Sequence, residues 1–403
     1  MTAGINKENI VGIITETGGK TSHSAILARA LEIPAVLSVN GAVSKLSAGA
    51  YVIVDGSEGV VIDEPDDAVI QEYDTKRINF LKERKELENF RGKATKALSG
   101  EEYELFCNIG KPEDAIKAVD ADGEGVGLFR TEFLFMDRTA LPTEDEQFDA
   151  YKKAALTLKG KPVIIRTLDI GGDKEIPYLG LKKEENPFLG FRAIRYCLKH
   201  KDLFKTQLRA IVKASAFGDV RIMFPLITAV EELREGKALV EEVKAELREQ
   251  GVEFNENIPV GIMTETSAAV MIADILAKES DFFSIGTNDL TGYTMACDRG
   301  NDDVAYLYSP LQPSVLRGIK YIIDCANKNN ISVGMCGEAA ANPMMVPLLM
   351  SFGLTEFSVS APSVLKVRKT ISAWSKAEAD KVAEKVLAMT TEKEISDYLK
   401  TLL

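Results

Sequence analysis

The stretch PVIIRTLDI at residues 162–170 is a run of aliphatic side chains that ends in charged residues, and GGDK follows it at 171–174. A short apolar run bounded by turn residues is typical of a buried strand. Seven more runs of this kind lie between residues 99 and 403, separated by amphipathic stretches such as 230–250. The eight runs are 104–109, 126–135, 162–170, 220–227, 258–264, 281–286, 331–336 and 355–360. Strands that alternate with helices are parallel, and eight such units predict an α/β fold, the (β/α)₈ TIM barrel.

The residues in front of this barrel predict a smaller unit and a connecting helix. Residues 1–63 contain short apolar strands, among them 51–54 and 60–62, separated by turns. A domain this short is marginal by itself, so we expect an incomplete one. Residues 66–90 contain neither glycine nor proline and mix both signs of charge, which predicts a long exposed helix. We assign 1–63 to a partial domain, 64–98 to a helical linker and 99–403 to the barrel.

Charge and cysteine content narrow the class of protein. The net charge of -12 argues against nucleic acid and anionic membranes as partners. No apolar run approaches the length of a membrane span, and the first residues lack the pattern of a signal peptide. The five cysteines include no C-x-x-C pair, which favours reduced thiols and therefore a cytoplasmic protein.

His23 is one of only two histidines and lies in TGGKTSHSAILAR at residues 17–29. An apolar segment at 10–15 predicts a strand before it, and 25–31 predict a helix after it. Free N–H groups and the dipole of a helix N-terminus favour an anion, so this position suits a phosphorylated imidazole. The alternative is a surface histidine in a strand–turn–helix connection. His200 lies at a predicted helix end, where we expect a solvated cap.

Arginines follow several of the predicted strands, at the end of the barrel where active sites lie. Arg130 and Arg166 end the second and third strands, Arg192 lies in the loop 186–192, and Arg299 follows the sixth strand. Guanidinium groups suit bidentate recognition of phosphate or carboxylate. A single arginine of this kind is often only a structural ion pair. Four at matching positions favour a site for an anion.

Two carboxylates end neighbouring strands. Glu265 ends the fifth strand and Asp289 the sixth. Adjacent strands lie about 4.8 Å apart, so the two side chains could share one cation. Magnesium takes one or two carboxylates together with substrate phosphate oxygens and water. The alternative is helix capping, by Glu265 for the helix that starts at 266–267 and by Asp289 for its own loop.

Cys336 lies between two glycines at the end of the seventh strand, facing the predicted site. A thiol there could donate a proton. We interpret Cys107, Cys197 and Cys325 as small buried hydrophobic residues instead.

Together these stretches resemble enzyme I of the bacterial phosphoenolpyruvate:sugar phosphotransferase system, over essentially the whole chain. The most specific are 18–29, 127–136, 166–174, 186–195, 282–291 and 334–340. Pyruvate phosphate dikinase and phosphoenolpyruvate synthase share the swivelling histidine domain and the barrel. GLFRTEFLFM at 127–136 and RTLDIGGDK at 166–174 are nevertheless similar to enzyme I, and the sequence contains no nucleotide-grasp domain of the kind a dikinase needs.

The resemblance implies phosphoryl transfer from phosphoenolpyruvate to His23, with release of pyruvate. It implies that Glu265 and Asp289 hold Mg²⁺ and that Cys336 protonates the enolpyruvate carbon. The substrate ligands that it implies are Arg130, Arg166, Arg192, Asn288, Asp289, Arg299 and Lys174. It further implies transfer from His23 to the histidine-containing phosphocarrier protein for sugar uptake, and a homodimer formed through the barrel.

The sequence departs from the family pattern at a few places. Lys20 stands where arginine is usual, and Gly292 replaces a usual glutamine. Family members also have a helical carrier-docking domain and the first strands of the phosphohistidine domain ahead of the segment that begins here. We therefore expect a C-terminal portion, in which 1–63 form a partial swivelling phosphohistidine domain. The alternative function is a phosphoenolpyruvate-binding or dimerisation module without carrier transfer.

Overall fold

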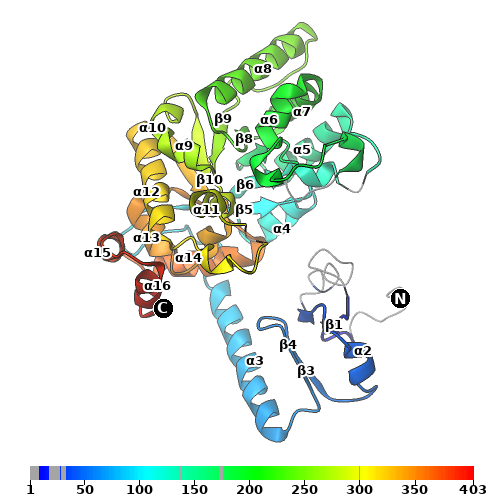
Figure 1. The fold of residues 1–403 in the computed structure, drawn as a ribbon, viewed down its shortest axis with the longest axis vertical. Coiled ribbons are helices and arrows are strands. Elements are labelled where there is room, and N and C mark those ends of the chain that lie inside the picture. Colours follow the sequence, from blue (N-terminus) through cyan, green and yellow to red (C-terminus); the bar gives the residue numbers. More distant parts are fainter. Residues whose placement is uncertain (1–8, 18–27, 29–32, 137, 172–175, 299) are drawn as a thin grey trace. The chain divides into compact units, whose positions relative to one another are not determined.

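The computed structural model describes residues 9–17, 28, 33–136, 138–171, 176–298 and 300–403. The chain divides into two compact units, Met1–Asn89 and Phe90–Leu403. Figure 1 shows both units. Within the described ranges, no helix combines the length and the apolar character needed to cross a membrane.

The first unit contains two small sheets and one long helix. Strand β1 (Ile13–Ile14) pairs in parallel with β2 (Ala35–Val36), and β3 (Val52–Asp55) pairs antiparallel with β4 (Val60–Asp63). Helix α2 is Ala42–Lys45, and α3 is Asp67–Glu88. The strand predicted at 10–15 is thus shorter than expected. His23 and all of the predicted helix 25–31 except Ala28 lie outside the described residues.

Helix α3 forms where the sequence lacks helix breakers. Asp66 caps it, because its Oδ1 accepts a hydrogen bond from the N–H of Val69 at 2.9 Å. None of its residues is buried, as the mixed charge of this segment predicted. The following residues 90–98 belong to the second unit by contact. Thr95 shows why, since its hydroxyl accepts a hydrogen bond at 3.0 Å from the buried side chain of Arg368.

The second unit is a closed barrel of eight parallel strands, which confirms the predicted fold. The strands follow one another around the barrel in chain order, and β12 closes it on β5. They are β5 (Glu104–Ile109), β6 (Gly125–Arg130), β7 (Val163–Arg166), β8 (Val220–Phe224), β9 (Val260–Thr264), β10 (Phe282–Ile285), β11 (Ser332–Met335) and β12 (Glu356–Val359).

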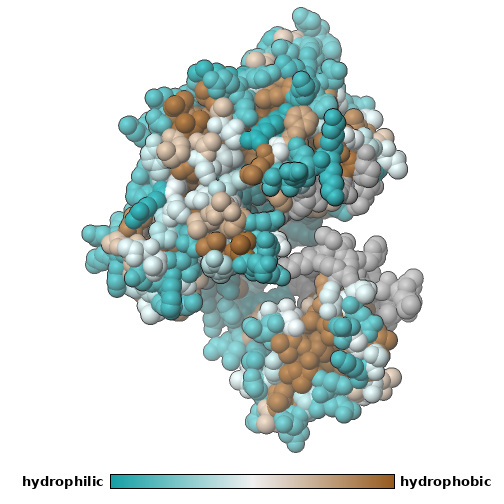
Figure 2. All heavy atoms as spheres, in the orientation of Figure 1, coloured by the Kyte–Doolittle hydropathy of each residue, from teal (hydrophilic) through white to brown (hydrophobic). Residues whose placement is uncertain are grey.

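Helices surround the barrel (Figure 1), and their outer surface over α8 is largely hydrophilic (Figure 2). They are α4 (Asp114–Asp120), α5 (Glu144–Leu158), α6 (Ala193–Lys199), α7 (Lys201–Ala214), α8 (Val230–Glu249), α9 (Ser267–Met271), α10 (Ala273–Leu276), α11 (Thr287–Met295), α12 (Pro313–Lys328), α13 (Val346–Phe352), α14 (Val364–Ser372), α15 (Lys376–Leu387) and α16 (Glu392–Lys400). Short 3₁₀ helices are η2 (Thr131–Leu134), η3 (Pro177–Leu179), η4 (Pro187–Leu189), η5 (Ser215–Phe217), η6 (Ala305–Leu307), η7 (Glu338–Ala341) and η8 (Ala361–Ser363).

The strands are largely apolar on both faces, because each face is buried. Outward side chains pack against the helices: Phe129 of β6 meets Tyr151 of α5 with ring centroids 5.7 Å apart. Inward side chains fill the barrel itself. This inner cluster consists of Leu128, Ile164, Met223, Met263, Phe282 and Cys336. Burial on both faces explains why the runs show no alternation of polar and apolar residues.

Several strands end earlier than the sequence predicted. The run 126–135 stays a strand only to Arg130, and η2 follows it. The side chain of Thr131 ends the strand by donating a hydrogen bond to the backbone oxygen of Arg166 at 2.8 Å. The run 162–170 likewise leaves the ladder after Arg166, where the N–H of Leu168 donates to Gln207 Oε1 at 2.9 Å. Apolar residues continue past these strand ends because the loops there are buried as well.

Candidate active site

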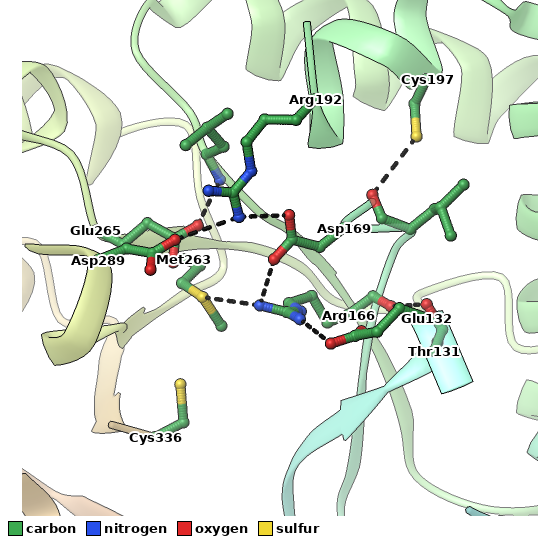
Figure 3. Close-up of polar contacts among 12 residues, drawn as sticks. Thr131, Glu132, Arg166, Asp169, Arg192, Cys197, Met263, Glu265, Asp289 and Cys336 are labelled. Atoms are coloured by element: carbon green, nitrogen blue, oxygen red, sulfur yellow. Dashed lines mark hydrogen bonds and ion pairs between the residues drawn. The ribbon is translucent and has the colours of Figure 1, made fainter. Parts of the chain in front are cut away.

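Two arginines end adjacent strands side by side at the mouth of the barrel. Arg130 of β6 and Arg166 of β7 are partners in the strand register. Arg166 is buried and engaged by two carboxylates (Figure 3): its Nη2 lies 2.7 Å from Glu132 Oε1 and its Nη1 lies 2.8 Å from Asp169 Oδ2. Arg130 is half-buried, and it makes no ion pair with any residue that the structure describes.

Arg192 continues this chain of charges from the loop before α6. Its Nη2 contacts Asp169 Oδ1 at 2.8 Å and Asp289 Oδ2 at 3.3 Å (Figure 3). The loop can bring Arg192 this close because residue 171 is glycine: a Cβ there would lie 2.5 Å from the Cβ of Arg192. Ala193 has a φ of 51°, a left-handed conformation that an alanine adopts only under constraint. The backbone is therefore strained where it carries the arginine into the site.

A tyrosine fixes the other side of Arg192. Arg192 Nη1 donates to the hydroxyl of Tyr293 on α11 at 3.3 Å, and that hydroxyl donates to the backbone oxygen of Phe188 at 2.5 Å. Burial raises the pKa of Tyr293 to about 12, so the phenol keeps its proton near neutral pH. Tyr293 thus links η4 to α11 directly, and the same hydroxyl holds Arg192.

Burial would disfavour the charges of both arginines, but the carboxylates outweigh it. For Arg166, Glu132 and Asp169 raise the pKa well above its usual range. For Arg192, Asp169 and Asp289 do the same. Both guanidinium groups are therefore permanently charged and held in fixed positions.

Glu265 directly follows β9 and is buried, with 2% of its surface exposed. Its Oε1 accepts a hydrogen bond from the N–H of Leu226 at 2.7 Å. Leu226 has a φ of 58°, so strained backbone aims this donor at the carboxylate. Burial, together with Asp289 and Asp169, raises the pKa of Glu265 to about 8.

The capping alternative for Glu265 is wrong, because Thr266 caps α9 instead. The hydroxyl of Thr266 accepts a hydrogen bond from the N–H of Ala269 at 3.0 Å. Asp289 lies in the first turn of α11 and pairs with Arg192 rather than capping a loop. Asn288 precedes it, and its Oδ1 lies 3.5 Å from the N–H of Glu338 on η7.

Cys336 follows β11 and belongs to the inner cluster of the barrel. In Figure 3 the sulfur of Cys336 points toward the side chain of Met263. Its backbone N–H donates to the oxygen of Ile285 at 3.1 Å, and its Sγ lies 3.8 Å from the same oxygen. Burial raises the pKa of the Cys336 thiol to about 11. The thiol is therefore neutral at physiological pH and still carries a proton to give.

The structure thus brings together six of the residues expected at the site: Arg130, Arg166, Arg192, Glu265, Asp289 and Cys336. Arg166 Nη1 lies 3.8 Å from the sulfur of Met263, and Met263 belongs with Cys336 to the inner cluster of the barrel, which places these groups in one region. Lys174 and Arg299, like His23, lie outside the described residues. His200 is exposed, and the centroid of its ring lies 4.2 Å from that of Tyr196 and 6.0 Å from that of Phe191.

Sequence reasoning missed the carboxylates that neutralise the arginines. Glu132 and Asp169 were part of the quoted stretches but received no role. Their signal was spacing, since Glu132 follows Arg130 by two residues and Asp169 follows Arg166 by three, just after a strand end. Tyr293, which holds Arg192, left no comparable signal.

The described residues contain no cluster of three or more histidine, cysteine, aspartate or glutamate side chains able to hold a metal ion. The pair of Glu265 and Asp289 nevertheless fits a magnesium ion that also takes oxygens from a substrate. Burial is the largest cause of the raised pKa of Glu265, and the neighbouring carboxylates of Asp289 and Asp169 raise it further. A divalent cation relieves the repulsion between carboxylates, and carboxylate oxygens are the ligands that it prefers.

Comparison with known proteins assigns both parts of the chain. Residues 84–375 match the family "PEP-utilising enzyme, PEP-binding domain", and residues 1–59 match "PEP-utilising enzyme, mobile domain". Among solved structures, a citrate lyase from Burkholderia xenovorans covers 71% of this chain and 81% of its own at 15% identity, with a TM-score of 0.44. So distant a likeness supports no conclusion about function.

Curated relatives with the printed name phosphoenolpyruvate-protein phosphotransferase match nearly the whole chain. The one from Bacillus subtilis is 49% identical over 399 residues, which are 99% of this chain and 70% of the relative. Those from Geobacillus stearothermophilus and Priestia megaterium are 49% and 47% identical, each over 99% of this chain and over 69% and 70% of their own length. The chain therefore belongs to the phosphoenolpyruvate-protein phosphotransferase (enzyme I) family of PEP-utilising enzymes.

Proposed function

We propose that the mouth of the barrel binds phosphoenolpyruvate and that its phosphoryl group passes to His23. The observation that carries this proposal is the arrangement of arginines. Arg166 and Arg192 are fixed by carboxylates, whereas Arg130 has no ion-pair partner among the described residues. A fixed set of guanidinium groups with one left to pair is suited to an incoming phosphate or carboxylate.

The remaining ligands follow from the family pattern. Arg130 and Arg166 contact the phosphoryl group, and Arg192 lies beside them. Asn288 and Asp289 at the start of α11 complete the described part of the site. Arg299 and Lys174, which lie outside the described residues, are proposed as further sources of positive charge. Positioning and charge neutralisation of this kind account for most of the catalysis in phosphoryl transfer.

Glu265 and Asp289 are the proposed ligands of Mg²⁺. The ion would neutralise charge on the phosphoryl oxygens while the substrate is bound. The protein's own contribution is the orientation of Glu265 by the N–H of Leu226, and of Asp289 by Arg192.

In the reaction, the bond between phosphorus and the enol oxygen breaks, and a bond forms between phosphorus and a ring nitrogen of His23. The electron pair left on the enolate is delocalised onto the methylene carbon. Cys336 gives its proton to that carbon, which yields pyruvate and a thiolate that recovers a proton from solvent. The raised pKa of the buried thiol supports the role of Cys336 as an acid.

We further propose that phosphorylated His23 serves the histidine-containing phosphocarrier protein, that the barrel forms a homodimer, and that the protein works in the cytoplasm. The family name supports the first of these, because its members phosphorylate a protein. The five free cysteines support the last, because a reducing compartment keeps thiols unpaired.

The test is incorporation of label from phosphoenolpyruvate carrying ³²P, in the presence of magnesium. We expect one acid-labile label per chain, lost in His23→Ala. His200→Ala is the matched control, because it removes the only other histidine. Label that persists in His23→Ala would contradict the assignment. Binding of phosphoenolpyruvate without any label would favour the alternative, a binding module without phosphotransfer.

A further inference from the structure

Asn108 on β5 makes a polar connection across three strands to the residue that carries the thiol. Its Nδ2 donates to the backbone oxygen of Cys336 at 3.0 Å and to that of Ser358 at 3.3 Å. Ser358 in turn donates through its hydroxyl to Asn108 Oδ1 at 2.7 Å. Both amide protons and the amide oxygen are therefore used, and the hydroxyl of Ser358 sets which way the amide faces.

The strand ladder explains why a side chain is needed there. The pairing of β11 with β12 ends at Met335 and Phe357, one residue before Cys336. The amide of Asn108 reaches across β12 and supplies the donor for the Cys336 carbonyl. The register between β5 and β6 shifts at this point, so that Asn108 lies opposite Leu128. Irregularities of this kind re-aim side chains near active sites.

The other side of Cys336 is held by β10 and α11. Its N–H donates to Ile285, and the next residue, Gly337, lies so close to α11 that a Cβ would come within 2.6 Å of the backbone nitrogen of Thr287. The cysteine peptide is thus fixed on one side by its N–H hydrogen bond and by close packing, and on the other, among the residues that the structure describes, by Asn108. Loss of Asn108 frees one side only.

We infer that Asn108, oriented by Ser358, is a positioning residue that fixes the Cys336 thiol for proton transfer. This rests on the proposed function, in which Cys336 protonates the enolate carbon. The geometry of that step is demanding, because a buried thiol is a weak acid and must meet the carbon directly. A displacement of about 1 Å can slow a positioned reaction about a hundredfold.

The experiment uses the full chain and measures two quantities: phosphoenolpyruvate affinity by calorimetry, and the single-turnover rate of pyruvate formation by rapid quench. In Asn108→Ala we expect affinity within about threefold of wild type and a rate about ten- to a hundredfold lower. Ser358→Ala keeps both amide donors and should lose less. Asn329→Ala is the matched control, because Asn329 Nδ2 donates to the Cys325 oxygen at 2.8 Å, outside the site, and should leave the rate unchanged.

The decisive comparison places Asn108→Ala in a Cys336→Ser background. If Asn108 acts through the thiol, adding Asn108→Ala to Cys336→Ser should slow the reaction no further, because the thiol that Asn108 positions is already gone. Equal slowing in both backgrounds, or an unchanged rate in Asn108→Ala, would overturn the inference. If Asn108→Ala does not fold, Ser358→Ala decides instead: a wild-type rate there overturns it. A wild-type rate in Cys336→Ser alone refutes the proposed proton donor, which is a separate and recognisable failure.

Discussion

Glu356 is a buried carboxylate that the proposed reaction does not use, and it should make the barrel less stable as pH rises. Its side chain is 5% exposed and lies over Gly127 and Gly334, where a Cβ would come within 2.4 Å and 2.8 Å of its Oε1. That oxygen is buried without a hydrogen-bond partner among the described residues. Burial, together with Glu104, raises the pKa of Glu356 from 4.5 to about 8, against the opposing effect of Arg221.

The sign of the effect follows from proton binding. Below pH 4.5 the carboxyl of Glu356 is protonated in both the folded and the unfolded chain, so its ionisation does not change the free energy of unfolding. Between the two pKa values the unfolded chain releases the proton while the folded chain keeps it. The free energy of unfolding therefore falls by about 1.4 kcal/mol per pH unit in that interval, and not further above the folded pKa. Between pH 6 and pH 8 the loss from this one group is about 2 kcal/mol.

Glu356→Gln keeps the shape of the side chain but cannot ionise, so it should remove this pH dependence. Urea unfolding can be followed by the fluorescence of Trp374, the single tryptophan, which lies in the barrel unit. We expect the stability of Glu356→Gln relative to wild type to rise by about 2 kcal/mol from pH 6 to pH 8. The control is Glu253→Gln at an exposed position, whose free energy of unfolding should change with pH as that of wild type does. Parallel curves for Glu356→Gln would refute the reasoning.

Three further predictions concern the site. Arg130→Ala removes a charge-assisted contact worth roughly 1.5–3 kcal/mol, so calorimetry should show phosphoenolpyruvate binding weakened about tenfold or more. The control variant Arg317→Ala, at an exposed position, should bind phosphoenolpyruvate with wild-type affinity. Wild-type affinity in Arg130→Ala would exclude Arg130 as a ligand. Cys336→Ser should bind the substrate but form pyruvate more slowly in single turnover, because a hydroxyl is a far weaker acid. Magnesium affinity, measured with substrate present, should rise with pH up to about 8, because the raised pKa of Glu265 means that the ion must displace a proton. Glu265→Gln should abolish this pH dependence of magnesium affinity. An equal pH dependence in both proteins would exclude Glu265 as a metal ligand.

The sequence predicted the barrel because its strands are short apolar runs at regular intervals, each buried on both faces. It predicted strand lengths less well. Arg166 ends β7, yet Leu168 and Ile170 beyond it are almost fully buried. Apolar character reports burial, and these loops are buried without being strands. The hydrogen bond from Thr131 to the oxygen of Arg166, which ends the neighbouring strand, depends on a partner 35 residues away.

The arginines were predictable for a similar reason. A charged residue at the end of a buried strand is rare unless it pairs with an opposite charge or binds a ligand. Their partners were not. That Asp169 bridges Arg166 and Arg192 depends on a loop path that requires Gly171 and a strained Ala193. Such a contact belongs to the folded chain and is not encoded in spacing alone. The same holds for Asn108, whose two acceptors lie 228 and 250 residues away in the sequence.

The charge balance of the site explains why substrate and metal binding should be linked to one proton. Glu265 lies beside Asp289 and Asp169, and two arginines offset only part of that negative charge. The raised pKa of Glu265 means that a proton completes the balance near neutral pH. Under the proposed function, magnesium would take the place of this proton, because both neutralise the same carboxylate, while Arg130 would pair with the substrate. Substrate and metal would then bind with the exchange of one proton for a cation.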